Sequence, residues 1–298
     1  MVLKLTGYRT SAAAYVNQPW AKYDWTRCPL MGSWSLGRRT QKLRFRLEDD
    51  ESLGAGVISG IKIKAHLGGM DLEKSYSPTS HPEARGFFDL LVKWYDQRPG
   101  GGMGLYLNEL KRGESITMRV KPQKFIHDKL LNQWKHIGLL VAGTGVAPAF
   151  NVLETLLNDP YDDTKISLLA THSLIGDALL LEDFRKFSQI RERIRHKTTL
   201  SRETDDLLRV TSGGIALGRI DHEKVRLYLP PPTEDDTLII VCGTGQFVDA
   251  MAGPVTRVVK DKIDNPDGST TTIKHKLQGP TLGILGDLGF QPHQVFKL

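Results

Sequence analysis

Two glycine turns are the residues of this chain best suited to chemistry, because bare glycines at the end of a strand leave backbone N–H groups open to an anion. The first turn, Gly143-Thr-Gly145, ends the apolar run 137–142 and precedes Pro148, which suits the first turn of a helix. The second turn, Gly243-Thr-Gly245, follows an apolar run that ends in Cys242. Each pattern is typical of a strand that leads into a helix and binds a phosphate at the junction.

The elements that must position these turns alternate between strands and helices. An apolar strand is predicted over 166–170, an amphipathic helix over 178–190 and a further strand over 198–201. This alternation predicts a parallel sheet with helices on both faces. Ligands of such sheets bind beyond the carboxyl ends of the strands, so the two glycine turns are expected to line one crevice.

The first half of the chain has a different pattern. Short runs with alternating apolar residues span 43–47, 60–67, 86–95 and 114–120, and a helix is predicted over 103–110. Alternation with turn residues between the runs favours an antiparallel β-barrel or sandwich.

The length of 298 residues indicates two domains, and the change of pattern predicts them at 1–128 and 129–298. Residues 257–278 are polar and contain Asn265-Pro-Asp-Gly268, a strong turn signal. This segment is expected to be a hairpin-like surface insertion with no part in cofactor binding.

Composition excludes several classes of protein. The net charge is +6, but no long basic run exists, which argues against nucleic-acid binding and favours an acidic protein partner. No apolar run is long enough for an integral membrane span. Two cysteines form neither a disulfide framework nor a metal site. A cytoplasmic location is expected; Lys4 and Arg9, in a first stretch of twenty residues without an acid, leave a mitochondrial location as the alternative.

Five motifs in order resemble those of the NADH–cytochrome b5 reductase family, within the ferredoxin–NADP reductase superfamily. They are Lys74-Ser-Tyr-Ser-Pro78, the strand Phe87–Tyr95, the loop Gly100–Leu107, Ala142-Gly-Thr-Gly-Val-Ala-Pro148 and Cys242-Gly-Thr-Gly-Gln-Phe247. The resemblance implies an antiparallel Greek-key β-barrel that binds FAD, followed by a parallel-sheet α/β domain that binds NADH or NADPH. It also implies hydride transfer to FAD and single-electron transfer to an acidic haem protein such as cytochrome b5.

The resemblance also implies site residues. Tyr76 and Ser77 are expected against the flavin and Cys242 beside the nicotinamide, and these three form the expected catalytic set. No metal is implied. The expected cofactor-binding residues are Lys74, Tyr76, Ser77, Leu91, Lys93, Tyr95, Gly101, Gly102, Met103, Gly104, Gly143, Thr144, Gly145, Pro148, Ser201, Arg202, Cys242 and Gly243.

Three residues depart from the family pattern in the part that grips the flavin pyrophosphate. Lys74 stands in place of an arginine, and Gly102 and Gly104 stand in place of a lysine and a hydroxyl residue. Backbone amides at a helix start still bind anions, but fewer donors predict looser FAD binding. Lys74→Arg and Gly104→Ser are therefore both expected to strengthen FAD binding.

The dinucleotide preference depends on the stretch Thr199-Leu-Ser-Arg202. Ser201 stands where cytochrome b5 reductases carry an acid that repels the 2′-phosphate of NADPH, and Arg202 could pair with that phosphate. NADPH is therefore expected to be accepted alongside NADH, unless these two are ordinary loop residues. Two alternative functions are a ferredoxin-, flavodoxin- or quinone-type NADPH reductase, and a non-catalytic module that has lost tight flavin binding.

Overall fold

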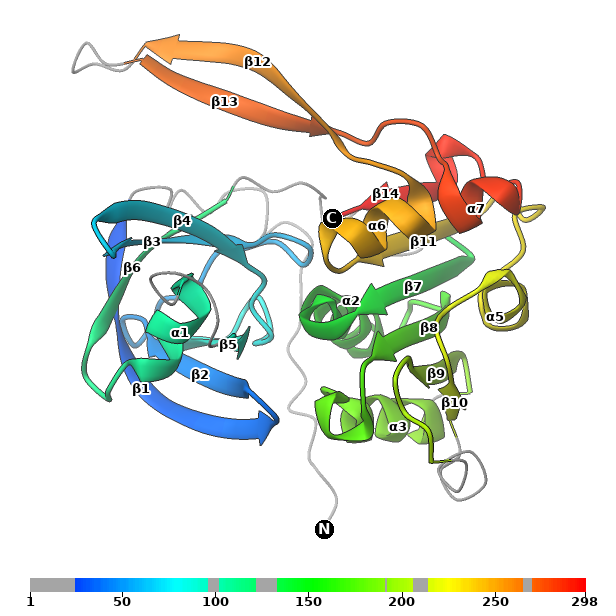
Figure 1. Ribbon diagram of the computed structural model, residues 1–298, viewed down its shortest axis with the longest axis horizontal. Coiled ribbons are helices and arrows are strands. Elements are labelled where there is room, and N and C mark those ends of the chain that lie inside the picture. Colours follow the sequence, from blue (N-terminus) through cyan, green and yellow to red (C-terminus); the bar gives the residue numbers. More distant parts are fainter. Residues whose placement is uncertain (1–24, 96–101, 122–132, 191, 206–213, 265–269) are drawn as a thin grey trace.

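The computed structural model describes residues 25–95, 102–121, 133–190, 192–205, 214–264 and 270–298. An antiparallel barrel and an α/β unit lie side by side, with α2 of the α/β unit next to the barrel (Figure 1). The predicted boundary at 128/129 lies outside the described residues. None of the helices in these ranges is long and apolar enough to cross a membrane.

The first sheet has the strand order β4-β3-β6-β1-β2-β5, with antiparallel neighbours throughout. A bridge between Pro78 and Leu90 joins the end of β4 to β5, which closes the barrel. Buried Leu43, Phe45 and Ile61 belong to its core. The elements are β1 (Thr26–Gly37), β2 (Thr40–Arg46), β3 (Ile61–Leu67), β4 (Met70–Tyr76), β5 (Phe87–Lys93), α1 (Gly102–Glu109) and β6 (Ser115–Val120).

The second sheet is parallel and has the order β10-β9-β8-β7-β11-β14. The chain runs outward from β7 through β8, β9 and β10, and then returns to the other side of β7 with β11. The direction of winding thus changes between β7 and β11, which is where such sheets bind ligands. The strands are β7 (His136–Ala142), β8 (Lys165–His172), β9 (Ile194–Leu200), β10 (Ile215–Leu217), β11 (Thr237–Cys242) and β14 (Val295–Lys297).

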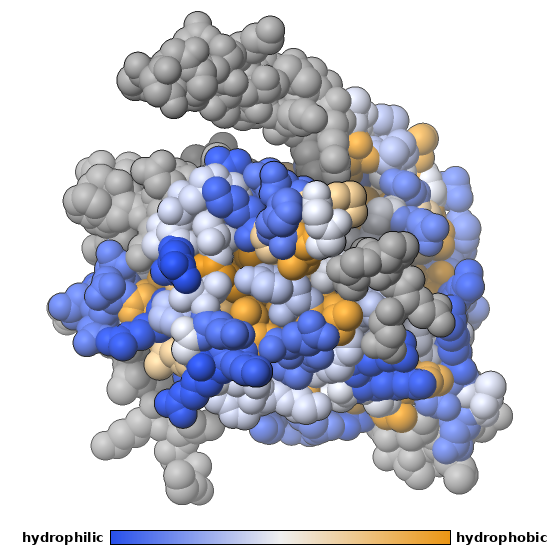
Figure 2. All heavy atoms as spheres, turned by 60° about the vertical axis from the view of Figure 1, so that its left-hand side comes forward, coloured by the Kyte–Doolittle hydropathy of each residue, from blue (hydrophilic) through white to orange (hydrophobic). Residues whose placement is uncertain are grey.

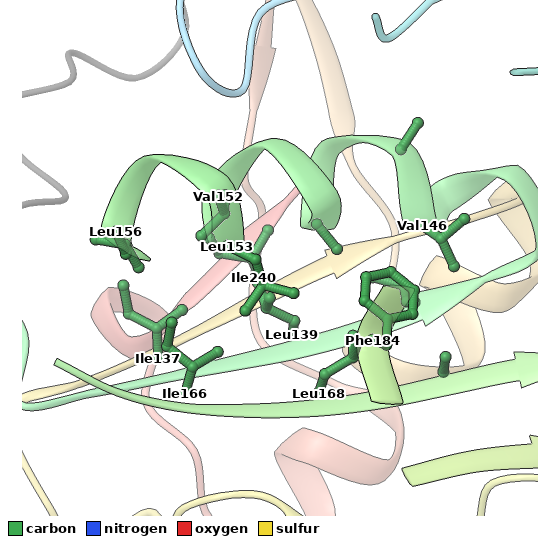
Figure 3. Packing of buried hydrophobic residues seen from close by; sticks show 14 of the residues in the cluster. Ile137, Leu139, Val146, Val152, Leu153, Leu156, Ile166, Leu168, Phe184 and Ile240 are labelled. Carbon is green, nitrogen blue, oxygen red and sulfur yellow. The ribbon is translucent and has the colours of Figure 1, made fainter. Parts of the chain in front are cut away.

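Helices cover both faces of this sheet, as the sequence predicts. On one face, Val152 and Leu153 of α2 pack against Ile137 and Leu139 of β7 (Figure 3). Leu140, the neighbour of Leu139, points to the other face because side chains alternate along a strand. The helices are α2 (Val146–Asn158), α3 (Leu181–Ile190), α5 (His222–Tyr228), α6 (Gly245–Ala252) and α7 (Gly283–Asp287), with short 3₁₀ turns η3 (Gly143–Gly145), η4 (Ile175–Asp177) and η5 (Pro292–Gln294).

The predicted insertion forms a hairpin-like arm, confirming its expected shape. Strands β12 (Thr256–Asp264) and β13 (Thr270–Leu277) pair with each other and project from the α/β unit (Figure 1). Lys297 holds the base, since its Nζ donates to the carbonyl oxygens of Pro254 at 3.3 Å and Pro280 at 2.7 Å. The turn at 265–268 lies outside the described residues.

Candidate functional site

The two glycine turns lie in direct contact, as expected for two turns at one edge of the sheet. A Cβ on Gly145 would lie 2.4 Å from the carbonyl oxygen of Cys242 and 3.0 Å from the nitrogen of Gly243. Strands β7 and β11 pair side by side up to Val141 and Cys242, so both turns begin at the same edge of the sheet. Only glycine at position 145 allows this approach of one backbone to another.

The space above the first turn is open. Gly143 has a φ of +56°, which favours glycine, and no atom lies within 4 Å of the position a Cβ would take. Thr144 is exposed, whereas Pro148 is buried within the first turn of α2. At the second turn, the Thr244 hydroxyl accepts a hydrogen bond from the Phe247 N–H and caps α6. The open Gly143 turn at the start of α2 thus suits a dinucleotide phosphate.

The residues expected beside the flavin lie at the end of β4. Tyr76 is partly buried and packs against the barrel core, and the Lys74 Nζ lies 5.8 Å from its ring centroid. Ser77 is half-buried directly after the strand. A cationic amine beside a half-buried aromatic ring is an arrangement that fits a flavin with an anionic tail.

The start of α1 fits the pyrophosphate role, but it corrects one expectation. A Cβ on Gly104 would lie 2.8 Å from the Lys93 carbonyl oxygen and 3.3 Å from the Trp94 Cα. The expectation that Gly104→Ser strengthens FAD binding is therefore wrong, because the helix packs too closely on the end of β5 for any side chain. The same closeness places the α1 amides beside β5. Gly101 lies outside the described residues, and Gly102 begins the helix with a φ of +67°.

Three further predicted residues have distinct environments. Leu91 is buried and belongs to the core cluster of the α/β unit, although it lies on the barrel strand β5. Met103 is buried in the barrel core. Tyr95, two residues beyond the end of β5, is 48% exposed.

Polar contacts join the two domains around this site, and the sequence pattern did not reveal them. Lys93 forms an ion pair of 2.9 Å with Asp177 in η4. The Asn151 Nδ2 donates to the Pro78 carbonyl oxygen at 2.9 Å. Pairings between residues this distant in sequence have no periodic signal, so only the fold shows them.

His172 ends β8 at the same edge of the sheet. Burial and, to a lesser degree, the Lys93 ammonium lower its pKa from 6.5 to about 4, against the opposing effect of Asp177. The ring is therefore neutral at neutral pH and adds no positive charge to the crevice.

The predicted dinucleotide-preference residues follow β9 at this edge too. The Ser201 N–H donates to the His172 carbonyl oxygen at 2.8 Å, and the Arg202 N–H donates to that of Ser173 at 2.9 Å. Arg202 is exposed. The Glu203 carboxylate accepts a hydrogen bond from the Ile175 N–H at 3.3 Å, which turns this acid toward η4.

Comparison with known proteins agrees with the geometry. Residues 27–125 match the oxidoreductase FAD-binding domain and residues 139–253 match the oxidoreductase NAD-binding domain. An NADH-cytochrome b5 reductase-like protein of Arabidopsis thaliana is 31% identical over 92% of this chain and 76% of its own length. The chain belongs to the NADH-cytochrome b5 reductase family. NADH-cytochrome b5 reductase 2 of Gallus gallus is 29% identical over 90% of this chain and 91% of that protein.

Solved structures show the same fold. The match to the cytochrome b5 reductase domain of Ulva prolifera nitrate reductase spans 76% of this chain and 90% of that chain. Its TM-score is 0.65 at 23% sequence identity. The match to the CS-b5R domains of human Ncb5or, in an NAD⁺ form, spans 92% of this chain and 69% of that chain. Its TM-score is 0.69 at 18% sequence identity.

The protein is thus an FAD-dependent oxidoreductase that uses a nicotinamide dinucleotide. Its residues fit both groups: the Tyr76 ring and the bare start of α1 suit FAD, and the open Gly143 turn beside Cys242 suits the dinucleotide. Among the described residues, no cluster of histidine, cysteine and acidic side chains could hold a metal ion.

Proposed function

We propose that this reductase of the cytochrome b5 reductase family passes electrons from NADH or NADPH, through FAD, to an acidic haem protein of the cytochrome b5 type. The names of its relatives support the haem-protein acceptor. A cationic surface on the barrel supports the acidic character of that partner.

The flavin, when bound, supplies the redox chemistry by taking up a hydride and releasing electrons singly. The protein's own residues hold and orient the two cofactors. The α1 amides and Lys74 bind phosphates, and Tyr76 provides a surface for the flavin ring. Cys242 and Gly145, whose backbones lie in contact, are the residues beside which the nicotinamide would bind.

The β1–β2 hairpin carries the cationic surface. Residues 25–47 contain six lysines and arginines and no acid; Lys42 and Arg44 pair with Asp89, and Arg46 pairs with Asp49. Trp34, 48% exposed, lies on this hairpin with exposed Met31 and Leu36. Figure 2 shows hydrophilic and apolar residues interspersed on the barrel side of the molecule. Arginine, tryptophan and methionine are enriched in protein interfaces, and positive charge attracts an acidic partner.

The hairpin also lies close to the crevice. Its Gly37 packs against Gly176 of η4, and the Arg38 N–H donates to the Gly176 carbonyl oxygen at 3.4 Å. A partner bound there would stand at the junction of the two domains, within reach of the flavin site.

A charge reversal on this hairpin tests the proposal. Arg38→Glu is expected to slow the reduction of cytochrome b5 several-fold at low salt and to leave ferricyanide reduction unchanged, because a small acceptor needs no docking surface. Arg226→Glu, the same change at an exposed position on α5, is the matched control. Equal cytochrome b5 reduction by both variants would contradict the proposal, as would faster turnover with ferredoxin, flavodoxin or quinone than with cytochrome b5.

A further inference from the structure

One buried side chain links the two halves of the site. Asn151 lies on α2, which begins at the Gly145 turn, and is 3% exposed. Its Nδ2 donates to the Pro78 carbonyl oxygen at 2.9 Å. Pro78 directly follows the flavin-side residues Tyr76 and Ser77. The hydrogen bond therefore connects the flavin segment to the helix that starts at the dinucleotide turn.

Both ends of this hydrogen bond are held firmly within their own domains. Pro78 pairs with Leu90 of β5, and the Thr79 N–H donates to the Asp89 carbonyl oxygen at 2.9 Å. On the other side, the neighbour Val152 is fully buried against the parallel sheet. Movement of one domain against the other must therefore stretch or break the Asn151 hydrogen bond.

The other domain contacts constrain the geometry differently. Val57, Ile58 and Leu91 of the barrel pack into the core of the α/β unit, but apolar packing has no preferred direction. At η4, the Lys93–Asp177 ion pair is partly exposed to solvent, and the hydrogen bond from the Arg38 N–H to the Gly176 carbonyl oxygen is long, at 3.4 Å. A buried hydrogen bond fixes both distance and angle, so it defines the relative position of two surfaces more sharply than these contacts.

The Asn151 side chain makes its hydrogen bond to Pro78 at a cost to stability. Within the described part of the chain, no hydrogen-bond partner reaches the buried Asn151 Oδ1, nor the buried hydroxyls of Thr155 on the next turn and Thr79 beside Pro78. A buried acceptor without a donor destabilises the folded state, so the hydrogen bond from Asn151 to Pro78 carries the cost of an unpaired Oδ1 beside it.

We infer that Asn151 is a positioning residue for hydride transfer, which sets the distance between the flavin segment and the dinucleotide turn. In this step a C–H bond of the reduced nicotinamide breaks, the hydride bonds to the flavin, the dinucleotide is oxidised and the flavin is reduced. The rate of such a step depends steeply on the approach of the two reacting atoms. The inference concerns this half of the reaction alone, so it stands whether or not cytochrome b5 is the acceptor.

Asn151→Asp tests it, because the carboxylate has nearly the same shape and presents an acceptor to the Pro78 carbonyl oxygen. In anaerobic stopped-flow at pH 8 and saturating NADH, flavin reduction in the FAD-loaded variant is expected to slow about 10- to 100-fold. FAD content and the NADH concentration for half-maximal rate should stay near wild type. Lower pH should restore the rate, because the protonated carboxyl of the variant can donate to Pro78.

Two companion measurements separate positioning from general damage. Asn158→Asp makes the same chemical change at the exposed end of α2 and should leave the rate unchanged. Reoxidation of the dithionite-reduced variant by ferricyanide should also be unchanged, since it involves no dinucleotide. Asn151→Leu, which removes both polar atoms at similar volume, is measured alongside. Wild-type flavin reduction in either FAD-loaded Asn151 variant would overturn the inference, and so would loss of FAD from both.

Discussion

Glu154 on α2 makes the stability of the protein depend on pH. Burial raises its pKa from 4.5 to about 7, opposed by Lys42 of the barrel and reinforced by Asp183 of α3. The folded state therefore binds a proton that the unfolded state releases between pH 4.5 and pH 7. Stability falls as pH rises through this range, because deprotonation is easier in the unfolded chain.

The size of the effect follows from the difference in pKa. A pKa difference of about 2.5 between the folded and unfolded states lowers the free energy of unfolding by about 3 kcal/mol at pH 8. This is an upper value, because part of the Glu154 side chain is exposed. Glu154→Gln removes the titration and keeps the shape of the neutral acid. At about 2–4 °C per kcal/mol for a domain of this size, the variant should melt about 5–10 °C above wild type at pH 8. At pH 5 the two melting temperatures should be nearly equal.

Thermal unfolding of the FAD-loaded protein, followed by flavin fluorescence between pH 5 and pH 8, measures this difference. Glu223→Gln, an exposed substitution on α5, is the matched control and should show no pH-dependent difference from wild type. A melting difference between Glu154→Gln and wild type that does not change with pH would refute the reasoning.

Five further outcomes are expected. Gly145→Ala should lower flavin reduction at least tenfold, measured by stopped-flow, because its Cβ would lie 2.4 Å from the Cys242 carbonyl oxygen and must push the turns apart. Gly104→Ser should weaken FAD binding and lower stability by about 1–3 kcal/mol through overpacking, whereas Lys74→Arg should tighten FAD binding by about 1 kcal/mol; titration of the apoprotein with FAD compares them. Ser201→Asp should raise the Michaelis constant for NADPH much more than that for NADH, and no change in preference would remove Ser201 from the phosphate site. Replacement of 257–277 by a short linker should leave FAD content and ferricyanide reduction unchanged, and loss of FAD would show that the arm supports the site.

Local pattern was enough to predict most of the second domain. The apolar runs before Gly143 and Gly243 correctly predict β7 and β11, because strands buried on both faces are continuously apolar. Strand β1 has no such signal, since its second half carries exposed Met31, Trp34 and Leu36 rather than an alternating pattern.

Only the part of the site that consists of sequence motifs could be predicted. The contact of Gly145 with Cys242 follows from strand order, because both turns end neighbouring strands. The hydrogen bond of Asn151 to Pro78 and the tight fit of Gly104 against β5 do not, because each depends on how separately folded segments meet. The family pattern has a hydroxyl residue where this chain has Gly104, which suggested that Gly104→Ser would strengthen FAD binding. The packing of Gly104 against β5 leaves no room for that side chain.

Anaerobic titration of the FAD-loaded protein with NADH tests the central claim most directly, namely that the crevice formed by the two glycine turns delivers a hydride to the flavin. The visible absorbance of the oxidised flavin should bleach in proportion to the NADH added and return when cytochrome b5 is supplied. An oxidised spectrum that persists with excess NADH and NADPH, in protein whose flavin dithionite reduces fully, would contradict the account.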